Sequence, residues 1–198
     1  MTPFYRFARG VCKLVCLTVW RFKAAGVENI PLEGPLIVAC NHVSYFDPPA
    51  LGVAMPRPVR YMAKMELFSI PVLGPVIAAL GAYPVDRKRG DTGAVKRALE
   101  LLRTGAAVGV FPEGTRNLDG TIKGQLGVAL LASLSGATVQ PAYIDGSAGA
   151  RRLQRISVVF GDPLRFERGQ KARREDLAKW TEEIMTRIYA LREKLGAH

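Results

Sequence analysis

Short apolar runs alternate with amphipathic segments along most of this 198-residue chain. The runs have the length and the β-branched content of buried strands, whereas the segments between them repeat apolar residues every three or four positions, as helices do. This alternation predicts an α/β fold in which helices cover a mixed, largely parallel sheet. The expected strands are 36–40, 59–63, 107–111, 138–144 and 154–160, and the expected helices are 91–103, 124–135 and 172–195.

The first 23 residues carry a different pattern. Stepped at about 100° per residue, their five main cations fall within an arc of roughly 160° on a helix. These cations are Arg6, Arg9, Lys13, Arg21 and Lys23, and the apolar residues opposite them are Phe4, Phe7, Val11, Leu14, Val15, Val19 and Phe22. The pattern predicts that residues 1–25 form an amphipathic helix that lies in a membrane interface. The alternative is a first helix that packs on the protein's own core.

Two longer uncharged runs, 67–85 and 124–144, could be mistaken for membrane spans, which need about 18 apolar residues. The first run is interrupted by three prolines and two glycines, which predicts short buried elements. The second run splits into a helix and a strand. We therefore expect neither run to cross a membrane.

The net charge of the chain limits the classes of molecule that it can bind. A net charge of +11 attracts nucleic acid, anionic lipid headgroups or phosphorylated substrates. The chain has no helix-turn-helix, zinc-ligand spacing or aromatic and basic face of the kind that single-strand binders use, so nucleic acid is not expected as a partner. The three cysteines lack metal-ligand spacing, and no metal site or organic cofactor is expected. A basic module that binds membranes without catalysis remains the alternative class.

One pair of residues suggests acid–base chemistry. His42 is followed five residues later by Asp47, and the only other histidine is the C-terminal His198. A turn from a strand into a helix, with Pro48 in the first helical turn, can fold the carboxylate back toward the imidazole. A neutral imidazole with a pKa of about 6.5 is a suitable base, and the carboxylate would fix its tautomer. The alternative is that Asp47 caps the helix and His42 is a structural residue.

Four blocks follow one another along the chain. They are Asn41-His42-Val43-Ser44-Tyr45-Phe46-Asp47, Gly81-Ala82-Tyr83-Pro84-Val85-Asp86-Arg87, Phe111-Pro112-Glu113-Gly114-Thr115-Arg116 and Val139-Gln140-Pro141-Ala142-Tyr143-Ile144. This succession resembles the glycerolipid acyltransferase family, whose bacterial members include 1-acylglycerol-3-phosphate acyltransferase. The first and third blocks match without departure, the second is looser and the fourth is short. The resemblance covers residues 26–162.

The resemblance implies acyl transfer without a covalent intermediate. The donor would be acyl-CoA or acyl-carrier protein, acting as co-substrate. The acceptor would be the free hydroxyl of 1-acyl-glycerol 3-phosphate (lysophosphatidic acid), giving phosphatidic acid in phospholipid biosynthesis. Glycerol 3-phosphate and other lysophospholipids are alternative acceptors.

The resemblance also implies a role for each matching residue. His42 would take the proton from the acceptor hydroxyl while Asp47 orients it. Arg87 and Arg116 would hold the acceptor's phosphate, which guanidinium groups bind in two-pronged fashion. Glu113 would position the glycerol hydroxyl. The alternatives are that Arg87 belongs to a solvated charge run and that Glu113 caps a turn.

Further residues in the blocks and beside them are also candidates for substrate binding. Gly114 permits a tight turn, and its N–H is a candidate donor to a developing oxyanion. Thr115 belongs to the same substrate-binding turn. Lys64 and Lys123 resemble family positions near the phosphate, and Pro141 resembles a residue that shapes the acyl-binding wall. The thiol of Cys40 would suit a covalent scheme, but its place on a buried strand favours a core residue.

The resemblance completes the expected organisation. Residues 26–198 would form the acyltransferase catalytic domain, behind the membrane-associating helix of residues 1–25. The partners would be a lysophospholipid acceptor, an acyl thioester donor such as an acyl carrier protein, and a membrane surface with anionic lipids. The enzyme would lie at the cytoplasmic face of the cell membrane as a peripheral or monotopic protein.

Overall fold

A mixed sheet forms the centre of the protein. The computed structural model describes residues 3–71, 73–85, 92–166 and 172–195, and within these residues a seven-stranded sheet has the order β1-β7-β6-β2-β5-β3-β4. Its strands are β1 (Lys23–Ala25), β2 (Leu36–Cys40), β3 (Val59–Lys64), β4 (Tyr83–Val85), β5 (Ala107–Val110), β6 (Thr138–Asp145) and β7 (Ser157–Phe160). Neighbouring strands are parallel except β6 and β7, which are antiparallel. The predicted α/β class is therefore confirmed.

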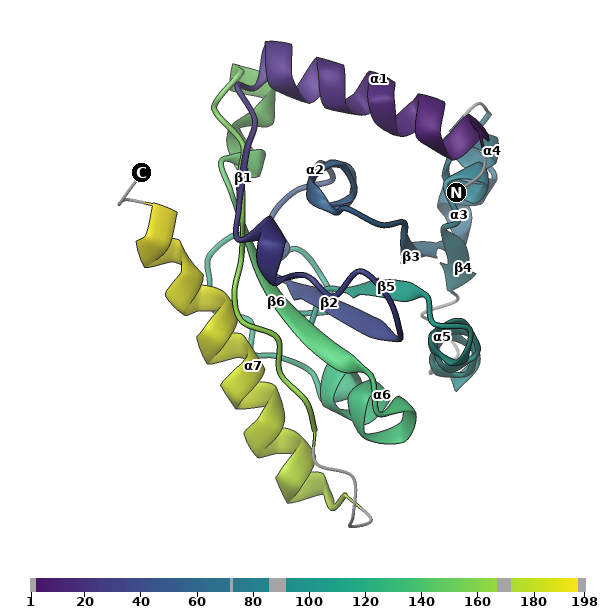
Figure 1. Ribbon diagram of the computed structural model, residues 1–198, viewed down its shortest axis with the longest axis vertical. Coiled ribbons are helices and arrows are strands. Elements are labelled where there is room, and N and C mark those ends of the chain that lie inside the picture. The colour runs from purple at the N-terminus through teal and green to yellow at the C-terminus, as the bar shows by residue number, and fades with distance from the viewer. Residues whose placement is uncertain (1–2, 72, 86–91, 167–171, 196–198) are drawn as a thin grey trace.

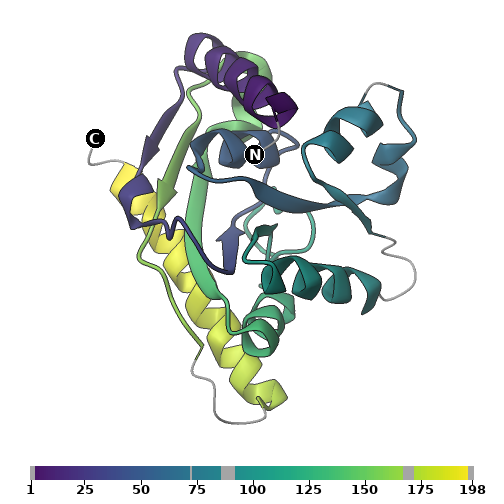
Figure 2. The same cartoon turned by 45° about the vertical axis from the view of Figure 1, so that its right-hand side comes forward.

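Helices cover both faces of this sheet (Figure 1). They are α1 (Pro3–Val19), α2 (Asp47–Ala54), α3 (Met65–Phe68), α4 (Leu73–Ala79), α5 (Thr92–Arg103), α6 (Gly127–Ser135) and α7 (Arg174–Leu195), with 3-10 helices η1 (Val27–Asn29) and η3 (Ser147–Arg152). One core cluster joins α1 and α2 to one face, and a second joins α5, α6 and α7 to the other. The hairpin of α3 and α4 lies beyond the β3–β4 edge (Figure 2).

Strand β2 occupies the middle of the sheet, between β6 and β5. All five of its side chains are fully buried. Leu36, Val38 and Cys40 face α2, whereas Ile37 and Ala39 face the layer of α5, α6 and α7, as the two-residue period of a strand requires. This burial on both faces explains the uninterrupted apolar run in the sequence. It also fixes the point at which the chain leaves the sheet toward His42.

Most predicted elements occur close to their expected bounds, with two shifts that have local causes. Helix α6 begins at Gly127 rather than 124, because the N–H of Gln125 donates to the carbonyl of Pro112 (2.8 Å) and keeps this segment in the preceding loop. Strand β7 begins at Ser157 rather than 154, because Leu153, which follows η3, adopts a left-handed conformation (φ 56°). The predicted cap of α5, Asp91, lies outside the described residues.

The N-terminal helix is shorter than the sequence pattern suggested. It ends at Val19, Arg21 adopts a left-handed conformation (φ 46°), and Phe22 turns into the core instead of extending the apolar face. The inner face of α1 packs on the core through Cys12 and Cys16. Its outer apolar face is exposed. The side chains on that outer face are Phe7, Val11, Leu14 and Val15.

The expectation of short buried elements in 67–85 is only half right. The prolines and glycines do divide this stretch into the short helix α4 and strand β4, but apolar side chains here are exposed. The physical reason is position, since the hairpin lies beyond the β3–β4 edge of the sheet (Figure 2). Among the described residues, no helix is both long and apolar enough to pass through a bilayer.

Candidate active site

Asn41 fixes the end of β2. Its side-chain Nδ2 donates to the carbonyl of Ile144 at 2.9 Å, and the N–H of Ile144 donates to its Oδ1 at 2.7 Å. These two bonds continue the pairing with β6 after the β2 backbone has left the sheet. Because Asn41 is buried, water does not compete for them. His42 therefore leaves the sheet from a defined position.

The β2–α2 turn brings His42 and Asp47 together. The imidazole Nδ1 lies 2.8 Å from Asp47 Oδ2, and the same oxygen accepts the N–H groups of Val43 and Ser44, each at 2.7 Å. Asp47 is the first residue of α2 and is fully buried, but its carboxylate points back to the turn and does not cap the helix. A ring that donates from Nδ1 to this oxygen has its Nε2 lone pair available as a base.

An aromatic row supports the imidazole ring. His42 stacks on Phe111, with ring centroids 4.2 Å apart, and Phe111 in turn stacks on Tyr61 at 6.4 Å. Gly109 of β5 makes room for this row, because a Cβ there would lie 2.3 Å from the Tyr61 ring. The side chain of His42 remains 16% exposed. The ring is thus held in place yet open to a substrate.

The backbone of His42 is held by the turn that follows β5. Its N–H donates to Glu113 Oε2 at 2.6 Å, and its carbonyl accepts the N–H of Asn117 at 2.6 Å. The other oxygen of Glu113 accepts Asn117 Nδ2 at 3.2 Å and the hydroxyl of Tyr189 from α7. Glu113 is fully buried. The sequence predicts that the Glu113 carboxylate positions the glycerol hydroxyl of the acceptor. In the structure, both of its oxygens accept hydrogen bonds from protein donors.

Asn117 and Tyr189 were missed by the sequence reasoning. Tyr189 lies 76 residues from Glu113, on the helix whose apolar stripe was interpreted as core packing alone. Burial and the charge of Glu113 raise the pKa of the Tyr189 hydroxyl, which keeps it a donor. The only hint in the sequence is the presence of a tyrosine between apolar stripe positions.

The N–H of Gly114, which the sequence predicts as a donor to a developing oxyanion, is used within the protein. This N–H donates to the carbonyl of Phe111 at 3.0 Å and so closes the turn. The residue has a φ of +71°, and a Cβ would lie 2.4 Å from the side-chain amide of Gln125. Glycine is required here for the backbone conformation and for space.

The described candidates for phosphate binding are exposed side chains. The Arg116 guanidinium stacks over the ring of Tyr45 at 4.0 Å, and both side chains are exposed. Thr115, Lys64 and Lys123 are exposed as well. In the described part of the chain, Arg116 forms no ion pair, so its charge is available to an anion. Arg87 lies outside the described residues.

Two other sequence candidates are buried in the sheet. Pro141 is a residue of β6 that pairs with Ala39 of β2, and its side chain is buried. Cys40 ends β2, and burial, followed by the charges of Asp47 and Glu113, raises the pKa of its thiol well above the ordinary value. A thiol held protonated in this way is a poor nucleophile, which agrees with the core interpretation. In the described ranges, no three His, Cys, Asp or Glu side chains are grouped to hold a metal.

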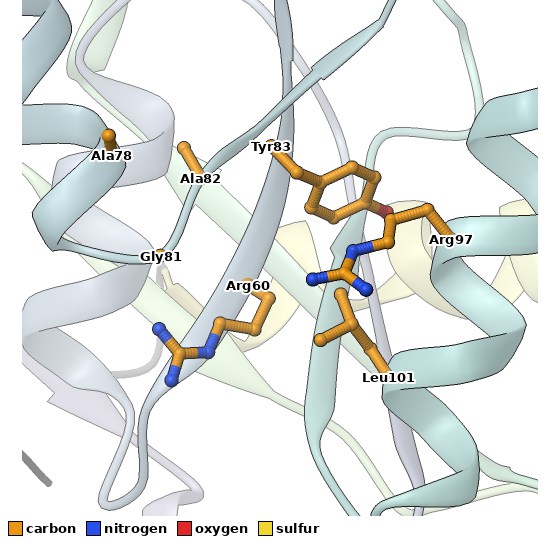
Figure 3. A pocket seen from close by; sticks show the side chains of 7 residues that line it. All are labelled: Arg60, Ala78, Gly81, Ala82, Tyr83, Arg97 and Leu101. Carbon is orange, nitrogen blue, oxygen red and sulfur yellow. The ribbon is translucent and has the colours of Figure 1, made fainter.

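A cavity of about 330 Å³ lies apart from this site. Figure 3 shows Arg60 of β3 and Arg97 of α5 at two sides of it, with Tyr83 between them. Arg60 belongs to the sheet face that α5 covers, whereas its neighbour Tyr61 faces α2 and the His42 stack. The cavity is therefore on the opposite face of the sheet from His42.

The fold is that of an acyltransferase. The sequence model of the family described as Acyltransferase matches residues 21–145, and the chain belongs to this family.

The named relatives of the chain indicate the type of acyltransferase. The chain is 30% identical over 196 residues to the 1-acyl-sn-glycerol-3-phosphate acyltransferase of Bacillus subtilis (strain 168), covering 96% of this chain and 98% of the relative. It is 27% identical to the enzyme of the same name from Streptococcus pneumoniae, covering 96% and 74%. The crystal structure of the 1-acyl-sn-glycerophosphate (LPA) acyltransferase PlsC from Thermotoga maritima superposes with a TM-score of 0.76 at 25% identity, covering 98% of this chain and 82% of that one. The protein is thus an enzyme of the 1-acylglycerol-3-phosphate O-acyltransferase type.

Proposed function

We propose that this enzyme transfers a fatty acyl group from a thioester donor to the free hydroxyl of 1-acyl-glycerol 3-phosphate, giving phosphatidic acid. The observation that carries the proposal is the His42 imidazole, which is held by Asp47 on its Nδ1 side and by Glu113 through its backbone. The names of the relatives support the acceptor. Acyl-CoA and acyl-carrier protein are both suitable donors, since both are anionic and the chain carries a net charge of +11.

His42 is the general base of the proposed reaction. Its Nε2 takes the hydroxyl proton as the acceptor oxygen attacks the thioester carbonyl, and the resulting tetrahedral intermediate then expels the thiolate. The imidazolium returns the proton to the thiolate sulfur, so the free thiol leaves and no acyl group becomes attached to the protein. Asp47 remains a carboxylate throughout and stabilises the imidazolium. General base catalysis of this kind contributes about 10²–10⁴-fold.

Arg116 is the proposed phosphate ligand among the described residues. Its stacking on Tyr45 directs the planar guanidinium without using its hydrogen-bond donors, which stay available for phosphate oxygens. Lys64, Lys123 and Arg87 are proposed as further cations around the same headgroup. Arg116→Ala should raise the KM for the acceptor by about tenfold, because a charge-assisted bond pair is lost. An unchanged acceptor KM would exclude this role.

Glu113, Asn117 and Tyr189 are proposed as positioning residues. They contact the backbone of His42 or one another and not the reacting atoms. With proton transfer assigned to His42, the proposed chemistry needs no metal or organic cofactor. Dialysis against a chelator should leave the rate unchanged, and a loss restored by a divalent cation would contradict this expectation.

We also propose that the enzyme works at the cytoplasmic face of the cell membrane as a peripheral protein. The support is α1, whose outer apolar face is exposed while its inner face packs on the core. Leu14→Asp, at a side chain that is 63% exposed, should weaken sedimentation with anionic vesicles. Unchanged sedimentation would exclude α1 as the anchor.

The direct test of the function is acceptor-dependent release of thiol. Purified enzyme with acyl-CoA should release free CoA when lysophosphatidic acid is added, and mass spectrometry should find phosphatidic acid. Parallel reactions with glycerol 3-phosphate, other lysophospholipids and an acyl-carrier-protein donor define both substrates. Release that is equally fast without an acceptor would show a thioesterase and contradict the proposal.

A further inference from the structure

Exposed apolar side chains gather on two segments of the molecule. The described residues include fifteen large apolar side chains that are exposed, of which six belong to α1 and four to the α3–α4 hairpin, residues 65–71 and 73–79. The four on the hairpin are Met65, Ile70, Leu73 and Val76, with exposures of 36–50%. Clusters of exposed apolar side chains on a protein surface usually mark a binding site for another protein or for a membrane.

The hairpin is a well-packed element. Gly74 brings α4 against α3, since a Cβ there would lie 2.1 Å from the carbonyl oxygen of Phe68. Its N–H donates to the carbonyl of Ile70 at 2.9 Å, so the tight turn satisfies its own backbone. The apolar side chains are therefore presented on a compact hairpin and are not the exposed core of an unfolded segment.

The hairpin and α1 lie side by side. Figures 1 and 2 both place α3 and α4 next to the N-terminal end of α1, on the side of the molecule opposite to α6. The position of α1 is fixed by Arg9, whose Nη2 donates to the carbonyl of Met55 at 2.5 Å. The two exposed apolar surfaces thus belong to one end of the molecule.

The charges of this end match an anionic lipid surface. The first acidic residue of the chain is Glu28, and between Asp47 and Asp86 the only acid is Glu66. Exposed cations border the apolar side chains on both segments, namely Arg6 and Lys13 on α1 and Lys64 before α3. Cations of this kind contribute on the order of 1 kcal/mol each near an anionic leaflet.

We propose that the α3–α4 hairpin is a second membrane-docking element, which enters the interface of an anionic bilayer beside α1. The inference rests on the proposed function in that the acceptor and the product are membrane lipids. A single interfacial helix is a narrow contact, over which the enzyme can tilt relative to the membrane plane. A second contact removes this freedom and fixes the direction in which the His42 site faces the lipid surface.

The test compares matched apolar-to-acidic variants of the full-length protein. Leu73→Asp changes the hairpin at a side chain that is 40% exposed, and Leu134→Asp changes a leucine that is 54% exposed on α6, far from α1 (Figure 1). The readout is partition onto vesicles of phosphatidylcholine mixed with phosphatidylglycerol, with circular dichroism to confirm folding. Leu73→Asp should lower the partition coefficient about tenfold, and Leu134→Asp should leave it unchanged. Equal partition of Leu73→Asp and the wild type would overturn the proposal, as would an equal loss in Leu134→Asp.

Two further measurements separate this proposal from its alternatives. With a short-chain lysophosphatidic acid that is monomeric in water, Leu73→Asp should keep the wild-type rate, whereas with acceptor in vesicles its rate should fall. A wild type that acylates neither form would refute the proposed function, while the partition result would still decide the docking. The apolar side chains of the hairpin could instead bind a second copy of the chain. In that case light scattering without lipid would show a dimer that Leu73→Asp dissociates, and this result would overturn membrane docking.

Discussion

Asp47 and Glu113 are two buried carboxylates that hold the same histidine from different sides. Each accepts hydrogen bonds from three residues: Asp47 from His42, Val43 and Ser44, and Glu113 from His42, Asn117 and Tyr189. Asp47 contacts the ring, whose charge changes during the proposed reaction. Glu113 contacts the peptide N–H, whose charge does not change. The same functional group should therefore act on the chemical step in one place and on position in the other.

The largest effect is expected for Asp47→Asn. The amide oxygen can still accept the donors of the turn, but the negative charge beside the imidazolium is lost. The kcat should fall by about 10³-fold with little change in KM, by analogy with the serine-hydrolase dyads. Steady-state kinetics measures this, with Asp162→Asn at an exposed position as the control. A fall in kcat of less than threefold would remove the distinction between the two carboxylates.

A smaller catalytic effect is expected for Glu113→Gln. The side-chain NH₂ would meet Asn117 Nδ2 donor to donor, while the amide oxygen can still accept the N–H of His42. We expect a loss of about 1–3 kcal/mol in the free energy of unfolding and about a tenfold lower kcat. Urea unfolding and kinetics measure the two quantities, with Glu183→Gln on the exposed side of α7 as the control. If kcat fell as far as in Asp47→Asn with stability unchanged, Glu113 would belong to the chemistry.

The smallest effect is expected for Tyr189→Phe. The substitution removes one donor to Glu113 and keeps the ring against Tyr143. The free energy of unfolding should fall by about 1 kcal/mol and kcat by about threefold, with KM unchanged. In the Glu113→Gln background the kcat loss should largely disappear, because the two residues act in series. Full additivity of the two losses would show that Tyr189 does not act through Glu113.

Tyr189 also gives a dependence of stability on pH. Its pKa is raised in the folded protein by burial and by Glu113. The folded state therefore keeps a proton that the unfolded chain releases near pH 10, so stability falls as the pH rises above about 10. Tyr189→Phe should reduce this alkaline loss in urea unfolding measured at several pH values. An identical slope in both proteins would contradict the assignment of the raised pKa to this residue.

The sequence was informative where structure depends on local pattern. The apolar run 36–40 and the stripe of 172–195 became β2 and α7, because burial on both faces or along one face determines composition directly. The approach of Asp47 to His42 followed from a short turn. The hydrogen bonds of Glu113 could not be inferred, since His42 is 71 residues away and Tyr189 is 76 residues away. The exposure of Leu73 depends on its place beyond the sheet edge, which periodicity does not encode.

The proposed reaction depends on removal of the acceptor's hydroxyl proton by the imidazole of His42. The most direct measurement is the rate of phosphatidic acid formation by His42→Ala, with circular dichroism and urea unfolding to confirm that the protein is folded. We expect a rate at least about 10³-fold below the wild type in a folded protein. A folded His42→Ala enzyme that forms phosphatidic acid at a near wild-type rate would contradict this mechanism.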